Sequence, residues 1–303
     1  MKNNNWTSAN IPDQTGKNII ITGATSGIGF EAAMVLSQKN ATIIMAARNP
    51  EKGKEAVKRI KDKNAKARLE LMKLDLADLN SVHAFSVEFH AKYSALHVLL
   101  NNAGIMHPKQ REETKQNFEI QFGTNHLGHF ALTGLLLDII KKTPKARVVT
   151  QSSIMHKVKA AIHFDDLNWE KSYDTARAYA QSKLANLLFT YELDRRFKLH
   201  GIDAFALACH PGYSNTNLQN TSGFFIKTMN KILAQTANRG ALSILRAATE
   251  APVFGAEYFG PTKLFETRGY PEKVTSSNKS HDLTAAKDLW EVSENLTNVH
   301  FDF

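Results

Sequence analysis

Short apolar runs alternate with longer amphipathic stretches through most of the chain. The runs are rich in Val, Ile and Leu, and the stretches between them repeat apolar positions at helical spacing. Several runs are almost continuously apolar, which is typical of parallel strands covered by helices on both faces. The pattern predicts strands at 18–22, 41–47, 69–74, 97–100, 147–151, 203–208 and 257–259.

The amphipathic stretches predict the helices that connect these strands. They lie at 27–38, 50–63, 77–92, 112–141 and 175–199. This alternation predicts an α/β, Rossmann-type doubly wound parallel sheet of about seven strands with helices on both faces. No repeat and no linker interrupts it, so we expect a single domain over 1–303, with a core at about 15–260. The extension 261–303 is expected to end in a helix, with Asp282 as its N-cap.

Two irregular segments break this rhythm, at 156–174 and 211–235. Long connections at strand ends often cover a ligand. Five aromatic residues in them are candidates for the wall of an apolar substrate pocket, although ordinary packing explains them almost as well. These are Trp169, Tyr173, Tyr213, Phe224 and Phe225.

Composition favours an ordinary globular protein, with 43% hydrophobic and 22% charged residues. The single cysteine, Cys209, excludes an intramolecular disulfide and a cysteine zinc cluster, and it fits a reducing compartment. The polar N-terminus has no signal-peptide pattern, and the longest apolar run, 130–140, is about half a membrane span. We therefore expect a cytoplasmic protein without a transmembrane segment.

The net charge of +9 is concentrated at 48–73, where ten Lys or Arg stand against four Asp or Glu. A solvated helix face explains this cluster, and so does a field that attracts an anionic ligand such as a phosphorylated cofactor. Nucleic-acid binding is not expected, because aromatic residues do not alternate with the basic ones.

A glycine-rich turn, Thr22-Gly23-Ala24-Thr25-Ser26-Gly27-Ile28-Gly29, joins the first strand to a helix. Gly23, Gly27 and Gly29 permit a tight turn and a close approach to a pyrophosphate, while the helix N-terminus offers free N–H groups. The turn, with Thr25, Ser26 and Ile28, is therefore a candidate dinucleotide-binding loop. Its alternative is a glycine-rich turn without a ligand. A Walker loop is disfavoured because the Gly-Lys-Ser/Thr ending is missing.

The second strand ends at Arg48 and carries no carboxylate there. An acidic residue at this place holds the ribose of NAD, whereas Arg pairs with the 2′-phosphate of NADP. The sequence thus favours NADP(H) over NAD(H), with Lys52 as a possible second contact. The alternative is a surface Arg at a strand end.

Tyr179 and Lys183 lie four residues apart near the start of a predicted helix, hence on one face. A nearby ammonium is expected to lower the pKa of the tyrosine toward a useful acid/base range. Such pairs are common on helices, so this pair alone has little weight.

Together these motifs resemble the short-chain dehydrogenase/reductase family over about 15–260. The resemblance also includes Asp75 after the third strand, Asn101-Asn102-Ala103-Gly104 after the fourth, Asn125, Ser152-Ser153 after the fifth, and His210-Pro211-Gly212 after the sixth. Within the family, 124–130 and 182–186 look most like the retinol-dehydrogenase-like branch, which also includes relatives of protochlorophyllide reductase.

The resemblance implies four catalytic roles. Tyr179 would donate a proton to the carbonyl oxygen, and Lys183 would bind the nicotinamide ribose and lower the pKa of Tyr179. Ser153, preferred to Ser152, would hydrogen-bond the substrate oxygen, and Asn125 would anchor a water in a proton relay.

The resemblance also implies cofactor contacts outside the glycine turn. Asp75 would accept a hydrogen bond from the adenine amino group beside the backbone of Leu76. Asn102, Ala103 and Gly104 would line the adenosine ribose. Pro211, Gly212 and Thr216 would flank the nicotinamide, or form a Pro-Gly turn with a solvated Thr.

Histidines add no further chemistry to this interpretation. His126 and His129 have the spacing of a metal pair, but no third ligand is evident and hydride transfer needs no metal, so we expect none. His156 and His163 are expected to be polar groups of a loop.

The sequence therefore predicts an NADP(H)-dependent oxidoreductase that interconverts a carbonyl and an alcohol on an apolar, bulky small-molecule substrate. A carbon–carbon double-bond reductase resembling protochlorophyllide reductase and a non-catalytic NADP-sensing protein are the alternatives. The stretches 112–141 and 175–199 allow a homo-oligomer, because family members pair subunits through such helices. Burial in the chain's own core would give the same apolar stripe, which includes Leu184, Leu187 and Leu188.

Overall fold

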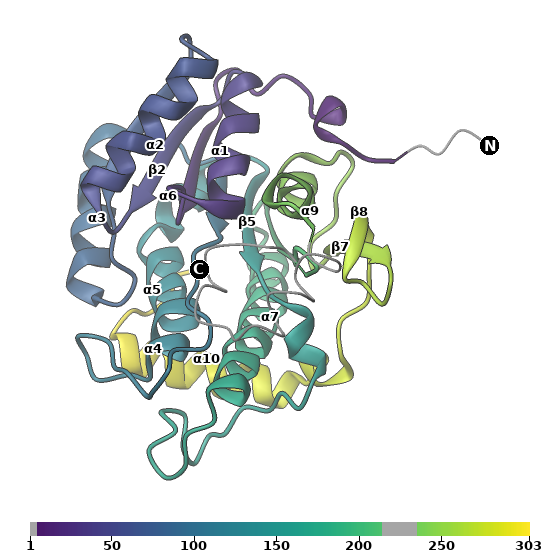
Figure 1. Ribbon diagram of the computed structural model, residues 1–303. Helices are drawn as coiled ribbons and strands as arrows, with labels where there is room; N and C mark the ends of the chain where they lie inside the picture. The colour runs from purple at the N-terminus through teal and green to yellow at the C-terminus, as the bar shows by residue number, and fades with distance from the viewer. Residues whose placement is uncertain (1–4, 214–234) are drawn as a thin grey trace.

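The computed structural model describes residues 5–213 and 235–303. Its centre is one eight-stranded sheet in the order β3-β2-β1-β4-β5-β6-β7-β8 (Figure 1). The first seven strands are parallel, and β8 runs antiparallel to β7. Their bounds are β1 Asn18–Thr22, β2 Thr42–Ala47, β3 Arg68–Lys73, β4 Val98–Asn101, β5 Ala146–Gln151, β6 Ala204–Cys209, β7 Tyr258–Lys263 and β8 Arg268–Lys273. The strand order reverses between β1 and β4, which confirms the doubly wound fold and marks the edge where such sheets bind ligands.

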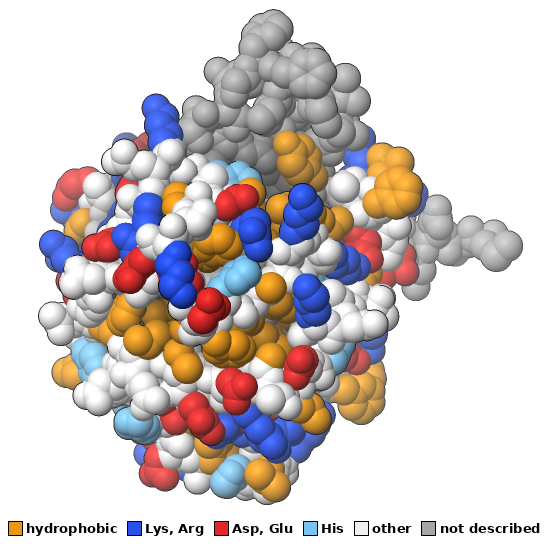
Figure 2. Space-filling view, turned by 90° about the horizontal axis from the view of Figure 1, so that it is seen from below, with side chains coloured by type: hydrophobic (Ala, Val, Ile, Leu, Met, Phe, Trp, Pro, Cys, Tyr) orange, Lys and Arg blue, Asp and Glu red, His pale blue; other side chains and the backbone are white. Residues whose placement is uncertain are grey.

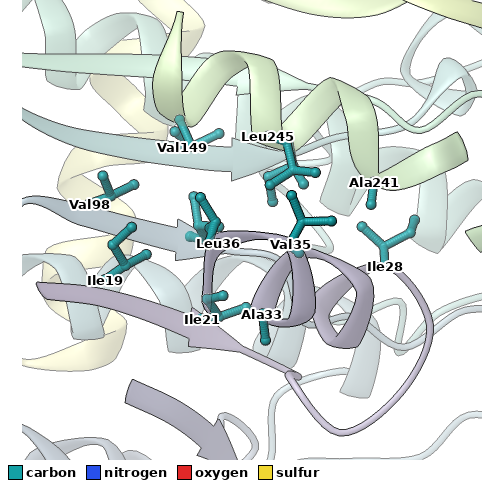
Figure 3. Close-up of a cluster of buried hydrophobic side chains, with 14 of the residues drawn as sticks. Ile19, Ile21, Ile28, Ala33, Val35, Leu36, Val98, Val149, Ala241 and Leu245 are labelled. Carbon is teal, nitrogen blue, oxygen red and sulfur yellow. The ribbon is translucent and has the colours of Figure 1, made fainter. Parts of the chain in front are cut away.

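Helices cover both faces of the sheet (Figure 1). Successive strand side chains point to opposite faces. Ile19 and Ile21 accordingly pack with Leu36 and Leu245 on one face (Figure 3), whereas Ile20 packs with Phe130 on the other. The helices are α1 Gly27–Gln38, α2 Pro50–Lys63, α3 Leu79–Lys92, α4 Ile120–Phe122, α5 Gly128–Leu135, α6 Leu137–Lys142, α7 Thr175–Leu199, α9 Ala237–Thr249 and α10 Leu283–Thr297.

The single helix expected at 112–141 is wrong. An antiparallel bridge joins Glu113 to Glu119, and α4 is followed by a π-helical turn, η2 (Gly123–Leu127), before α5 and α6. The Glu119 side chain accepts a hydrogen bond from the backbone N–H of Phe122 and so starts a helix within the stretch. The apolar pattern continues across α4, η2 and α5 because residues 118–133 are all buried.

Other boundaries also differ from expectation. Helix α3 begins at Leu79 because Asp78 caps it, accepting from the N–H of Asn80. Helix α9 and strand β8 were not predicted, and β7 extends beyond 259 to Lys263. Strand β8 includes Gly269 and Pro271, which are tolerated at the edge of a sheet and weaken the strand pattern in the sequence.

Helix α10 crosses α7 and α5 on one side of the sheet (Figure 1). Its residues Ala286 and Leu289 pack with Leu184 and Leu188 of α7. The apolar stripe of α7 is therefore buried within the chain itself. The outer face on this side has hydrophobic side chains at its centre and charged ones around them (Figure 2).

Within 5–213 and 235–303, no helix is both long and apolar enough to span a bilayer.

Candidate active site

A cavity of about 860 Å³ opens at the carboxyl ends of the central strands. It contains nearly all of the residues that the sequence predicts for cofactor and substrate. These are Gly23, Thr25, Ser26, Gly27, Ile28, Gly29, Arg48, Asp75, Leu76, Asn102, Ala103, Gly104, Ser153, Tyr179, Pro211 and Gly212. Thr216 lies outside the described residues, as do Phe224 and Phe225.

Asn125 and Lys183 lie directly behind the cavity wall. A Cβ placed on Gly104 would lie 3.2 Å from Asn125 Oδ1 and 3.5 Å from Lys183 Nζ. Gly104 lines the cavity, so both side chains lie directly behind this residue.

The glycine turn is shaped for close approach. Gly23 and Gly27 have φ values of +68° and +55°, which side chains rarely adopt. A Cβ on Gly29 would lie 2.5 Å from both Asn102 Nδ2 and Gly23 O, so only glycine fits there. Ser26, the N-cap of α1, makes no side-chain cap hydrogen bond. The backbone N–H groups of this first turn thus remain available to an anion.

One end of the cavity is basic. Arg48, Lys52 and Arg59 line it together with Glu55, and the Arg59 guanidinium lies 4.1 Å from the centre of the Phe30 ring. Arg59 was not predicted, although its seven-residue spacing from Lys52 places both on one face of α2. This end has the charge that a phosphate requires.

Between the basic end and the glycine turn, Asp75 and Asn102 offer polar atoms. Asp75 Oδ1 accepts from the N–H of Ala77 (3.0 Å). Asn102 Nδ2 donates to Thr22 O (2.7 Å), while its Oδ1 is buried without a hydrogen-bond partner in the described residues. An unpaired buried acceptor at a cavity wall is suited to a ligand's donor.

The opposite end holds Ser153, Tyr179 and Lys183. Ser153 lies close enough to the Tyr179 hydroxyl to oppose the rise in its pKa that burial causes, and both residues line the cavity. Lys183 Nζ donates to Gln151 O (3.1 Å) and lies 5.6 Å from the centre of the Tyr179 ring. Ser152 Oγ donates instead to Lys183 O (2.8 Å). The two adjacent serines thus have different partners, and Ser153 is the one beside Tyr179.

Burial shifts the pKa values of this pair. It raises the pKa of Tyr179 to about 12, against the opposing effect of Ser153, and it lowers the pKa of Lys183 to about 8. The expected lowering of the Tyr179 pKa is therefore wrong for the chain itself. The reason is that both groups are desolvated and that Lys183 bonds to a backbone carbonyl, not to the phenol.

Asn125 belongs to the π-helical turn η2, a feature frequent at functional sites. Its Oδ1 accepts from Ile105 N (2.7 Å), and its Nδ2 donates to Ile105 O (2.9 Å) and Ser182 Oγ (3.0 Å). Asn125 thereby fixes the loop after β4 against α7. Its role as a water anchor stays a prediction.

The histidines at 126 and 129 have separate partners. His126 Nε2 is 2.8 Å from Ser293 Oγ, and His129 Nε2 is 2.9 Å from Thr22 Oγ1. Burial lowers their pKa values to about 3 and about 4. Across the described ranges, no group of three His, Cys, Asp or Glu could hold a metal ion.

The cavity wall also includes apolar residues that were not predicted, among them Ile105, Met106, Ile154 and Met155. His107 packs edge-on against the Tyr179 ring, with ring centres 5.4 Å apart. A Met or His directly after the Asn-Ala-Gly motif gave no recognisable signal in the sequence.

The predicted aromatic wall is only partly correct. Tyr213 lines the cavity, whereas Trp169 and Tyr173 do not. Trp169 packs against His163, and the Tyr173 hydroxyl donates to Glu119. These two residues anchor the outer loop instead of facing a substrate.

Comparison with known proteins extends over almost the whole chain. The sequence model of the short chain dehydrogenases matches residues 17–223. Human retinol dehydrogenase 13 is 41% identical over 295 residues, which are 94% of this chain and 85% of that protein. Polyprenol dehydrogenase of Danio rerio is 36% identical over 299 residues, 96% of this chain and 90% of that protein. The crystal structure of an uncharacterized protein from Mycobacterium paratuberculosis is similar with a TM-score of 0.83 and 40% identity, covering 99% of this chain and 100% of that one.

Proposed function

The chain belongs to the short-chain dehydrogenase/reductase family, and from that premise we propose that it is an NADP(H)-dependent enzyme interconverting a carbonyl and an alcohol on an apolar substrate. One observation carries the proposal. A single cavity has Arg48, Lys52 and Arg59 at one end and Ser153 and Tyr179 at the other.

The lining residues fit a dinucleotide phosphate. The glycine turn leaves backbone N–H groups for a pyrophosphate, and Asn102 Oδ1 is an unpaired acceptor on the adenosine side. Arg48, Lys52 and Arg59 form no ion pair within the described residues, so their charge is available to a 2′-phosphate. Asp75, Leu76, Ala103 and Gly104 would line the adenosine, and Pro211 and Gly212 the nicotinamide.

The bound nicotinamide would supply the hydride for reduction and accept it in oxidation. The chain's own residues handle the proton. A pKa of about 12 keeps Tyr179 protonated at neutral pH, so its hydroxyl can donate to a carbonyl oxygen during reduction. Ser153 lines the cavity beside Tyr179 and can donate a hydrogen bond to the same oxygen. The Lys183 ammonium stabilises the phenolate that remains after proton transfer.

The substrate end supports an apolar substrate class. Ile105, Met106, Ile154 and Met155 line the same cavity as Tyr179 and offer apolar surface to a substrate. Two similar proteins carry names that refer to retinol and polyprenol, both long apolar alcohols. A long aldehyde or ketone with a single polar end is therefore the substrate class we propose.

The test is NADPH oxidation by the purified protein with a panel of aliphatic, aromatic and polyene aldehydes and ketones. Tyr179→Phe should lower kcat by about 10²- to 10⁴-fold, because it removes only the proton donor, with NADPH affinity changed less than about two-fold. Tyr93→Phe is the matched control, since the Tyr93 hydroxyl bonds to Glu70 and lies outside the cavity.

Equal activity of Tyr179→Phe and the wild type would contradict the assigned proton donor. NADPH binding without turnover of any carbonyl would instead favour a double-bond reductase or an NADP-sensing protein, and activated alkenes would then separate the two.

A further inference from the structure

Ser153 accepts hydrogen bonds through both its side chain and its carbonyl oxygen. Its extended backbone (φ −154°, ψ 156°) places it at the N-cap of the 3-10 turn η3 (Ile154–Lys157), where Ser153 Oγ accepts from Met155 N (3.3 Å). Its side chain lines the cavity beside Tyr179 and opposes the rise in the pKa of that residue. Its carbonyl oxygen accepts two hydrogen bonds from one residue, His156, through the backbone N–H (3.1 Å) and the ring Nδ1 (2.6 Å).

The tautomer of His156 follows from its other neighbour. His156 Nε2 lies 3.1 Å from the backbone nitrogen of Ser277, which can only donate. Nε2 must therefore be the acceptor, and Nδ1 carries the proton that is donated to Ser153 O. The ring is buried and does not line the cavity, so it has no access to a substrate. His156 joins Ser153 to a residue 124 positions later in the chain.

Ser277 belongs to a segment that is itself fastened to α7. Ser276 Oγ is 2.8 Å from the Tyr191 hydroxyl, and the His281 ring stacks on the Tyr191 ring with centres 4.7 Å apart. Tyr191 lies on the same helix as Tyr179 and Lys183. The 3-10 turn η5 (Asn278–His281) thus links the serine loop to the helix that carries the proton donor.

Glu266 forms a second connection between the C-terminal part of the chain and the loops at the cavity. Glu266, in the turn between β7 and β8, accepts from Lys157 Nζ (2.8 and 2.9 Å) and lies 3.4 Å from His210 Nε2. Lys157 follows His156, and His210 precedes Pro211 and Gly212 of the cavity wall. Residues 261–303, the C-terminal extension, therefore contact the loop after β5, which carries Ser153, and the loop after β6, which carries Pro211 and Gly212.

We propose that the C-terminal extension positions Ser153 against Tyr179, with His156 as the positioning residue and the Ser277 N–H as the contact that orients its ring. This inference rests on the proposed function, because it assigns a purpose to the geometry of the same site. The hydrogen bond from Ser152 Oγ to Lys183 O already joins the end of β5 to α7. The extension, through His156, also restrains the position of the carbonyl group of Ser153.

The contact between His156 and the backbone N–H of Ser277 can be tested by substituting Ser277. Its φ of −68° suits proline, which has no N–H, and its hydroxyl has no hydrogen-bond partner within the described residues. Ser277→Pro removes the donor to His156, whereas Ser277→Ala keeps it and loses the same hydroxyl. We expect Ser277→Pro to lower kcat for carbonyl reduction by about ten-fold relative to Ser277→Ala, with the KM for NADPH unchanged.

Hydrogen exchange supplies a readout that needs no substrate. Amides in the peptide covering 152–158 should exchange about ten-fold faster in Ser277→Pro than in Ser277→Ala, because His156 loses its orientation. Equal exchange and equal kcat in the two variants would overturn the inference. A wild type that reduces no carbonyl would refute the proposed function, and the exchange comparison would still decide the positioning.

His156 itself gives a second comparison if Ser277→Pro does not fold. The amide of Asn can replace the Nδ1 donor to Ser153 O, whereas Phe fills the ring volume without a donor. At matched Tm, His156→Asn should retain a kcat several-fold above that of His156→Phe. Equal kcat values in these two variants would show that His156 only fills space, which overturns the proposal.

Discussion

The ammonium of Lys183 lies 5.6 Å from the centre of the Tyr179 ring and donates its hydrogen bond to the carbonyl oxygen of Gln151. The pair is therefore coupled by charge and not by a direct hydrogen bond. Burial acts on the two groups in opposite ways, disfavouring the phenolate of Tyr179 and the ammonium of Lys183. Below pH 8, the chain thus holds a protonated acid beside a cation, the state that carbonyl reduction requires.

This arrangement predicts how reduction depends on pH. Lys183, with a pKa of about 8, loses its charge as the pH rises through that value, while Tyr179, with a pKa of about 12, stays protonated. We expect kcat/KM for reduction to be level from pH 6 to about pH 8 and then to fall toward ten-fold per pH unit. Initial rates from pH 6 to 10 measure this profile. A level profile up to pH 10 would show that the charge of Lys183 is not needed.

Cofactor preference should depend on the basic end of the cavity. Arg48→Ala should weaken NADPH binding by about 10- to 100-fold and leave NADH binding nearly unchanged, because only NADPH has the 2′-phosphate. Lys61→Ala is the control, since Lys61 lies on α2 outside the cavity. Fluorescence titration with both cofactors measures the effect. Equal losses for NADPH and NADH would contradict a phosphate contact at Arg48.

Much of the site could be predicted because its residues have local patterns. The glycine turn follows an apolar strand directly. Tyr179 and Lys183 share a helix face because they are four residues apart, which does not depend on the rest of the fold. Each of these features depends on fewer than about ten consecutive residues, so the sequence alone indicates them. Their convergence in one cavity follows from the parallel sheet, whose carboxyl ends meet at one edge.

The remaining features depend on particular hydrogen bonds, some of them between distant segments, that leave no mark on the apolar pattern. The breaks at 112–141 arise where Glu119 caps α4 and where η2 brings Asn125 to Ile105, and neither contact alters the apolar pattern. The partners of His156 are 3 and 121 residues away, so the sequence indicated only a polar loop residue. The pKa of Tyr179 could not be predicted from the spacing to Lys183, since burial decides its direction.

Helix α10 should contribute strongly to stability through Trp290. This side chain is 2% exposed and packs against Phe130, Phe189 and Phe301. Trp290→Ala should lower the free energy of unfolding by about 3–5 kcal/mol, because it leaves a large cavity in the core. Leu283→Ala, on the same helix at a side chain 62% exposed, should change it by less than about 0.5 kcal/mol. Urea unfolding compares the two, and a similar small change in both would mean that α10 packs loosely.

Glu266 should stabilise the fold in a pH-dependent way. The neighbouring His210 ring, 3.4 Å away, and the Lys157 ammonium hold the pKa of the carboxyl at about 2, against a usual value of 4.5. A carboxyl with a lowered pKa contributes stability that is complete above about pH 4.5 and is lost as the pH falls toward 2. Glu266→Gln should therefore lower the Tm by a few degrees, about 2–4 °C, at pH 7, and the difference should shrink between pH 4.5 and 3. Glu51→Gln is the control, because the Glu51–Lys54 pair is exposed and should matter little at any pH. Scanning calorimetry at pH 7, 4.5 and 3 measures both variants. If the Tm of Glu266→Gln stays below that of the wild type by the same amount down to pH 3, packing of the β7–β8 turn, and not the ionised carboxylate, holds the loops of Lys157 and His210 together.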